Sequence, residues 1–304
     1  IAIVGASLAY FTDTDNEHQH IHVRRVKIDL IEQQSNEDHT GFVPYTGDKV
    51  LMPIVGSAQG EKYPNGQPKA ANYIDKVVTI QNTGKSAAWI RAYYAVPSDL
   101  DDGYETFNAG ANILHGNFGN KIVDGTVYTT FGAEWNWMHD GKWNYFETTM
   151  DGVSYNVYFA DYYQPVAANE TTEQLICGVY LDKNVDMKDG KYIDTRYPNA
   201  DLSILEGTVK YPVFAVAVQA EGFDTAAAAM DAAFGANYNP WGGTATNWQI
   251  PSPNRKQIGF PDSTISSLFF CGSGPVTRPT PDTPVTSGSC RVAESPPVGS
   301  LPPR

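Results

Sequence analysis

The feature that most constrains this chain is a series of short strand-like segments separated by turn residues. In "VKIDLIE" apolar side chains recur at every second position, at Val26, Ile28 and Leu30, which is the pattern of a half-buried strand. "VSYNVYFADYY" repeats this pattern from Val153 to Phe159, and "QLICGVYLD" and "GTVKYPVFAVAVQAEGF" are further strand-like runs. The sequence therefore predicts an all-β fold.

Turn signals and one helix complete this outline. "KVVTIQNTGKSAAWIRAYYAVP" predicts two strands around a turn at 82–85, where the Asn and the Gly can supply unusual backbone angles. Asp-Gly pairs at 140–141 and 151–152 are hairpin signals. A long loop is expected over 33–72. "DTAAAAMDAAFG" predicts a helix that begins at Asp224 or Thr225 and ends at Gly235.

Composition restricts the classes of function. The chain has 304 residues, enough for one large or two modest domains, and its formal net charge is −13. This charge disfavours nucleic acid as a partner, because nucleic-acid binding needs clustered Lys and Arg. It suits a secreted surface protein that self-repulsion keeps soluble. The 18 Tyr and 6 Trp, with frequent Gly and Pro, favour strands and turns over helices.

The chain has three cysteines, which is too few and too odd a set for a disulfide framework. Cys177 lies in a strand-like run, so we expect a buried free thiol. Cys271 and Cys290 flank a Pro/Ser/Thr-rich stretch, and pairing between them stays an open alternative. From Pro275 the composition is typical of a disordered tail.

The first residues read as the end of a secretory signal peptide. "IAIVGASLA" is apolar, and Ser7 and Ala9 stand at the −3 and −1 positions of a cleavage site that would leave Tyr10 as the first mature residue. Residues 1–9 are too few for a membrane span, which needs ~20 residues, so we expect no membrane segment in the mature form. A buried first strand is the alternative.

Four segments, in order, carry a family resemblance: "GASLAYFTDTD" with "VKIDLIE", "VTIQNTGKSAAWIRAYYAV", "YYQPVAANETTEQLICGVYLD" and "FAVAVQAEGFDTAAAAMDAAFG". They resemble the exported proteins processed by the signal peptidase SipW, which are the TasA and camelysin relatives of Gram-positive bacteria. The resemblance implies a secreted jelly-roll β-sandwich over 26–270, with long loop insertions, one short C-terminal helix and a tail at 271–304. The region 98–143 has no counterpart in the family and is expected to be an insert.

Some relatives form biofilm matrix fibres in which the segment exposed by signal cleavage adds as a strand to the next subunit. In this chain the apolar phase shifts at Arg24-Arg25, because Ile21 and Val23 are at odd positions and the following apolar residues are at even ones. A bulge explains the shift, and so does a boundary before a donor strand at 10–25. The donor residues would be Tyr10, Phe11, Ile21 and Val23, and the partner would be this chain itself or a related matrix subunit.

Two groups of residues are candidate metal ligands. His18, His20 and His22 alternate along "EHQHIHVRR", and two of them could share a zinc or copper ion. The alternatives are a solvated strand face or a pH-sensitive contact in assembly. "TDTDNE" and "SDLDDGYE" offer carboxylates for calcium, but neither run has the spacing of an EF-hand, which favours a solvated loop; these carboxylates belong to Asp13, Asp15, Asp99, Asp101 and Asp102.

The aromatic run "EWNWMHDGKWNYF" offers a different kind of site. Trp135, Trp137 and Trp143 could form a platform for a glycan, which would make the chain a monomeric surface carbohydrate-binding or adhesin module, or they could pack in a core. No His-Glu-x-x-His, Gly-x-Ser-x-Gly or phosphate-binding loop is present in the sequence. The remaining histidines, at 39, 115 and 139, stand in loop-like segments, so the sequence predicts no enzyme.

Overall fold

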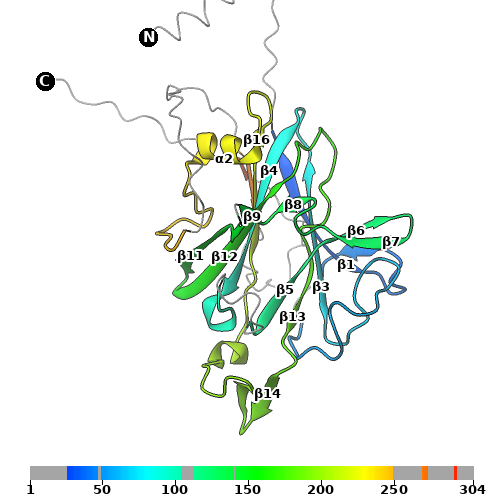
Figure 1. Cartoon of the computed structure of the whole chain (residues 1–304), viewed down its shortest axis with the longest axis vertical. Helices are drawn as coiled ribbons and strands as arrows, with labels where there is room; N and C mark the ends of the chain where they lie inside the picture. The colour runs from blue at the N-terminus through cyan, green and yellow to red at the C-terminus, as the bar shows by residue number, and fades with distance from the viewer. Residues whose placement is uncertain are drawn as a thin grey trace, which may run out of the picture.

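The computed structural model describes residues 26–46, 49–103, 112–139 and 141–248, together with the backbone of 269–272 and 291–292. These residues form a β-sandwich of two antiparallel sheets, which confirms the predicted all-β class (Figure 1). No helix among them is long and apolar enough to cross a membrane. The segments 1–25 and 273–290, with 293–304, lie outside this description, and so do the predictions made for them.

The first sheet has five strands and the second has seven. The order in the first is β2 (Phe42–Pro44), β1 (Ile28–Ser35), β3 (Ile74–Asn82), β13 (Ile176–Leu181) and β5 (Leu114–Phe118). In the second it is β11 (Tyr145–Met150), β12 (Val153–Tyr162), β4 (Ala88–Pro97), β16 (Val213–Gln219), β17 (Phe269–Gly272) and β18 (Arg291–Val292), and β8 (Trp135–Asn136) pairs with the end of β12.

Three hairpins and three short helical elements complete the described fold. The hairpins are β6 (Asn120–Val123) with β7 (Thr126–Thr129), β9 (Met138–His139) with β10 (Lys142–Trp143), and β14 (Val185–Lys188) with β15 (Lys191–Asp194). The helical elements are η1 (Ser98–Leu100), η2 (Ser203–Glu206) and α2 (Ala226–Phe234).

The connections make the sandwich jelly-roll-like. The chain changes sheet between β3 and β4, between β4 and β5, between β5 and β8, between β12 and β13, and between β13 and β16. Strands that are neighbours in a sheet therefore come from distant parts of the chain, as they do in interleaved Greek keys. The region 98–143 belongs to this scheme rather than standing apart from it, because it supplies β5 to one sheet and β8 to the other.

The turn at 82–85 differs from its prediction. Both predicted strands exist, as β3 and β4, but they lie in different sheets and do not pair. Neither Asn82 nor Gly84 has a positive φ angle. The Asn82 side chain instead accepts a hydrogen bond from the Gly84 N–H at 3.0 Å and donates to the carbonyls of Ser86 and Val166, each at 2.8 Å. This buried side chain holds the corner where the chain passes between sheets.

Hydrophobic side chains form two layers, one on each face of the seven-stranded sheet. The inner layer fills the sandwich, and Ile28, Ile80 and Leu175 are among its buried members. The outer layer lies between this sheet and the segment that contains α2. Tyr155, Val157 and Phe159 pack in this outer layer, which confirms the face predicted for β12.

The helix and the Asp-Gly hairpins agree with their signals. Thr225 is the N-cap of α2, because its Oγ1 accepts a hydrogen bond from the Ala228 N–H at 3.2 Å, and Gly235 ends the helix with φ 85°. Asp151 and Gly152 join β11 to β12 with φ angles of 51° and 82°, as a type I′ turn requires. Gly141 has φ 74° in the hairpin of β9 and β10.

The predicted tryptophan platform is wrong, because the three rings are buried. Trp135 and Trp137 are 0% exposed and Trp143 is 7% exposed. Trp137 packs edge-on against Tyr94, with ring centroids 5.4 Å apart, and Trp143 stacks with Phe118. The alternative of core packing is the one observed. The sandwich needs these rings because large aromatic side chains supply much apolar burial.

An ion pair is buried in the outer layer. Arg91 of β4 lies opposite Asp161 of β12, and its Nε and Nη2 donate to the two carboxylate oxygens at 2.6 and 2.9 Å. The guanidinium also lies over the Phe159 ring, 4.9 Å from its centroid. Burial acts to lower the pKa of Arg91, but the Asp161 charge outweighs it and the pKa is raised. Both charges are therefore satisfied by each other across neighbouring strands.

Removal of the Asp161 carboxylate leaves a buried cation without its partner. We expect Asp161→Ala to lower the free energy of unfolding by about 3–5 kcal/mol, measured from urea denaturation midpoints. The double variant Arg91→Met/Asp161→Leu removes both charges and is expected to regain most of that loss. Equal losses in the single and double variants would contradict this role for the pair.

Candidate functional site

A cavity of about 140 Å³ is lined by residues of both sheets, including the edge strand β5. Tyr94 and Tyr158 reach it from the seven-stranded sheet, and His115 and Tyr180 reach it from the five-stranded sheet. Asp101, directly after η1, forms part of its wall. The cavity therefore combines aromatic rings with several polar side chains, which is the mixture found in small-ligand sites.

Asp101 is the most deeply placed acid in this region, at 6% exposure. Its Oδ2 accepts hydrogen bonds from the Tyr158 hydroxyl at 2.7 Å, the Asn156 Nδ2 at 2.8 Å and the Gly103 N–H at 3.2 Å. Burial raises the pKa of Asp101 above its usual value, although these hydrogen bonds act to lower it. The side chain is a fixed hydrogen-bond acceptor.

A larger cleft of about 550 Å³ shares Asp101 with the cavity. Strands β11 and β12 and the residues around 244–246 supply most of its walls. Its side chains are mainly hydroxyls, amides and carboxylates; they include Ser98, Asp102, Glu147, Thr149, Ser154 and Thr246. The cleft is hydrophilic, so it suits a ligand with many polar groups rather than an apolar one.

Hydrogen bonds fix the polar groups in the cleft. The Tyr145 hydroxyl lies 3.0 Å from Glu147 Oε1 and 2.8 Å from Asn156 Oδ1. The second oxygen of Glu147, Oε2, accepts from the Asn247 Nδ2 at 2.8 Å. The Tyr145 hydroxyl has one proton, so it donates to Glu147 or to Asn156 but not to both at once, and the Asn156 amide donates to Asp101. These hydrogen bonds hold acceptor atoms in place before a ligand arrives.

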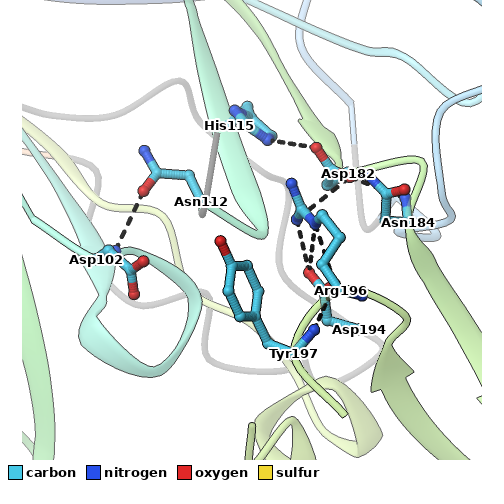
Figure 2. Close-up of polar contacts among 8 residues, drawn as sticks. All are labelled: Asp102, Asn112, His115, Asp182, Asn184, Asp194, Arg196 and Tyr197. Atoms are coloured by element: carbon cyan, nitrogen blue, oxygen red, sulfur yellow. Dashed lines mark hydrogen bonds and ion pairs between the residues drawn. The ribbon is translucent and has the colours of Figure 1, made fainter. Parts of the chain in front are cut away.

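On the other side of the cavity, charged groups join β5, β13 and β15. Figure 2 shows His115 pointing to Asp182, and Arg196 lying between Asp182 and Asp194. The His115 Nε2 is 3.0 Å from Asp182 Oδ2, and the Arg196 Nη2 is 2.6 Å from Asp194 Oδ2 and 3.4 Å from Asp182 Oδ1. We call His115, Asp182, Asp194 and Arg196 the charged cluster.

The charged cluster attaches the β14–β15 hairpin to the sandwich. Asp182 follows β13, Asp194 ends β15, and Arg196 contacts both carboxylates. Burial acts to raise the pKa of Asp182, but hydrogen bonds from His115 and Asn184 and the Arg196 charge lower it to about 2. Its acids and bases satisfy one another, so we assign this cluster a structural role.

The residues proposed from sequence have different outcomes. Ser7, Ala9, Tyr10, Phe11, Ile21 and Val23 lie outside the described residues, as do His18, His20 and His22, and those predictions stay predictions. Of the acids in "SDLDDGYE", Asp99 and Asp102 are exposed, and Asp101 is buried and held by neutral donors. Within the described ranges, no three His, Cys, Asp or Glu side chains are grouped to hold a metal ion.

Other polar residues were missed or misplaced. His115 was expected in a loop but lies on β5, and its partner Asp182 comes from a different part of the chain. Asn156 could have been noticed, because it interrupts the apolar residues of "VSYNVYF" and is only 4% exposed. Cys177 is a buried free thiol, as predicted, and burial raises its pKa to about 11.

Comparison of the chain with protein-family models, with curated proteins and with solved structures found no match. The function is therefore argued from the molecule itself.

The low pKa of Asp182 gives the charged cluster a pH dependence. Because the folded-state pKa of about 2 is below the ordinary 3.8, the carboxylate contributes stability above pH ~4 that is lost as the pH falls towards 2. We expect Asp182→Asn to lower the free energy of unfolding at pH 7 by about 1–3 kcal/mol. The difference in the free energy of unfolding between Asp182→Asn and the unmodified protein should shrink between pH 4 and pH 2, measured by urea denaturation at each pH.

Asp186→Asn is the matched control, because Asp186 is exposed on the neighbouring strand β14 and the charge change is the same. It should change stability little at any pH. A loss for Asp182→Asn that is equal at pH 7 and pH 2 would contradict the assignment.

Proposed function

We propose that this chain is a secreted structural subunit of an extracellular filament, and that it assembles by donating its N-terminal segment, residues 10–25, as a strand to a neighbouring copy. The observation that carries the proposal is the outer edge of β16, which takes a strand from a remote part of the chain. The partner is a second copy of this chain or a related subunit.

The strand on the β16 edge, β17, is short, and a donor strand at this edge would take its place. β17 pairs with β16 through four residue pairs, from Phe214 with Gly272 to Ala217 with Phe269. On its other edge β16 pairs with β4 through seven residues, from Val213 to Gln219. β17 also lies against β1 of the other sheet. It therefore occupies the seam where the two sheets meet, which we call the β1/β16 seam.

The backbone of β16 is oriented to bind a strand at this seam. The Ala95 N–H donates to the Pro212 carbonyl at 3.0 Å, and hydrogen-bonding groups alternate along an antiparallel pair. The N–H groups of Ala215 and Ala217 consequently point away from β4 and toward the seam. Strand addition uses such backbone groups for affinity and alternate side chains for specificity.

The start of the domain supports a donor segment before it. Val26 and Ile28 are 2% and 0% exposed, so the even-numbered apolar phase belongs to the sandwich core. The odd-numbered phase of Ile21 and Val23 ends at Arg24-Arg25, before Val26, the first residue that the structure describes. The apolar side chains therefore alternate in one register before Arg24-Arg25 and in another after it. A donor segment and an acceptor domain require two such registers, because each packs its apolar face in a different place.

The proposal is tested by truncation and by a face-specific double variant. We expect filaments in negative-stain electron microscopy from protein that starts at Tyr10 and none from protein that starts at Val26. Ile21→Asp/Val23→Asp should abolish filaments, because two carboxylates would enter a neighbour's groove. His20→Asp/His22→Asp changes the alternate face of the same segment and should leave filaments in place. Filaments from the Val26 form would refute strand donation.

A further inference from the structure

We propose that the cleft and the cavity that share Asp101 form a binding site for a neutral polyhydroxylated ligand, namely a short oligosaccharide. The cleft of about 550 Å³ has the size of typical ligand sites, which range over ~300–1,000 Å³. The cavity behind Asp101 adds about 140 Å³ between aromatic rings. The site is distinct from the tryptophans, which are buried in the core.

The charges around the site exclude an anionic ligand. Asp101, Asp102 and Glu147 all line the cleft, and none of its described lining residues is Lys or Arg. The described lining of the cavity also lacks Lys and Arg. A sulfated or carboxylated ligand would meet like charges here without compensation. The ligand is therefore neutral or cationic.

The hydrogen bonds of the carboxylates favour a neutral ligand over a cation. Asp101 Oδ2 already accepts from three uncharged donors, Glu147 Oε2 accepts from the Asn247 amide, and the Tyr145 hydroxyl lies 3.0 Å from Glu147 Oε1. These bonds disperse the negative charge and hold the oxygens as directed acceptors. Ligand hydroxyls can use the lone pairs that remain, since an ionised carboxylate offers about four acceptor sites.

A second, independent observation is an unsatisfied hydroxyl beside the cavity wall. Tyr94 is 4% exposed and lines the cavity. The ring of Tyr94 stacks on Tyr158 and Tyr211, with centroids 5.3 and 5.4 Å apart. The Tyr211 hydroxyl is buried without a partner among the described residues, and it lies close to Gly116 of the cavity wall.

An unpartnered buried hydroxyl costs free energy, so it indicates a partner supplied from outside the chain, either a water molecule or a ligand hydroxyl. A sugar residue suits this position because its hydroxyls can pair with Tyr211 and Asp101 while its apolar face contacts the aromatic rings. The more open cleft then holds the following residues against Thr, Ser and Glu147. The described lining of the cleft comes mainly from β11, β12 and η1 and includes no residue of β16, so ligand binding can be tested separately from filament assembly.

The first test is a glycan array that carries neutral, sulfated and carboxylated glycans, with affinities then measured by calorimetry on the neutral glycans that bind. We expect binding to neutral glycans alone. Asp102→Ala should weaken binding by at least about tenfold, because a hydrogen bond to a charged group is lost. Asp99→Ala is the matched control: Asp99 is exposed on the same turn but does not line the cleft, and affinity should be unchanged.

Two further variants separate binding from folding. Thr149→Arg places a long side chain at an exposed position of the cleft and should abolish binding without altering the melting temperature. Tyr211→Phe should weaken binding about two- to tenfold while stability is kept or increased, because its hydroxyl has no partner among the described residues to lose. Absence of binding to every neutral glycan would overturn the proposal. So would binding of spermidine or Ca²⁺ that Asp102→Ala removes, because that result would assign the cleft to cations.

Discussion

The central strand β4 is buried along all ten of its residues, and the rest of the fold follows from covering both of its faces. One face packs on the five-stranded sheet and the other is covered by α2 and the segment after it. A polar side chain in such a strand must find a partner beside it, which explains why Arg91 is paired with Asp161 on the neighbouring strand. Burial on both faces also explains why so many aromatic residues of the chain are internal.

Sequence alone was sufficient for the elements whose signals are local. The alternation in "VSYNVYFADYY", the Thr225 cap and the Asp151-Gly152 turn each depend on neighbouring residues, and each is present in the structure. The passage from β3 to β4 was misjudged because Asn82 acts through its side chain, with Val166 as a distant partner. The tryptophans were misplaced for the same reason: their burial depends on strands that the sequence does not show to be adjacent.

The candidate site was harder to predict than the fold. Its central group was visible as one acid in "SDLDDGYE", but the donors that hold Asp101 come from β12, more than fifty residues later in the chain. Only the three-dimensional arrangement distinguishes this acid from the exposed Asp99 and Asp102. The β1/β16 seam and the cleft use different strands, so the proposed strand addition and the proposed ligand binding involve different parts of the molecule. A subunit joined at the seam can therefore present the cleft as a separate binding surface.

We propose that the segment before the sandwich becomes a strand in another copy, and hydrogen–deuterium exchange can measure the protection that such pairing gives. Exchange of residues 10–25 would be compared between assembled and unassembled protein that starts at Tyr10. We expect slow exchange of this segment in the assembled form and fast exchange in the unassembled form, because strand addition pairs its N–H groups with a neighbour. Fast exchange in both forms would contradict it, and so would equal protection in the two.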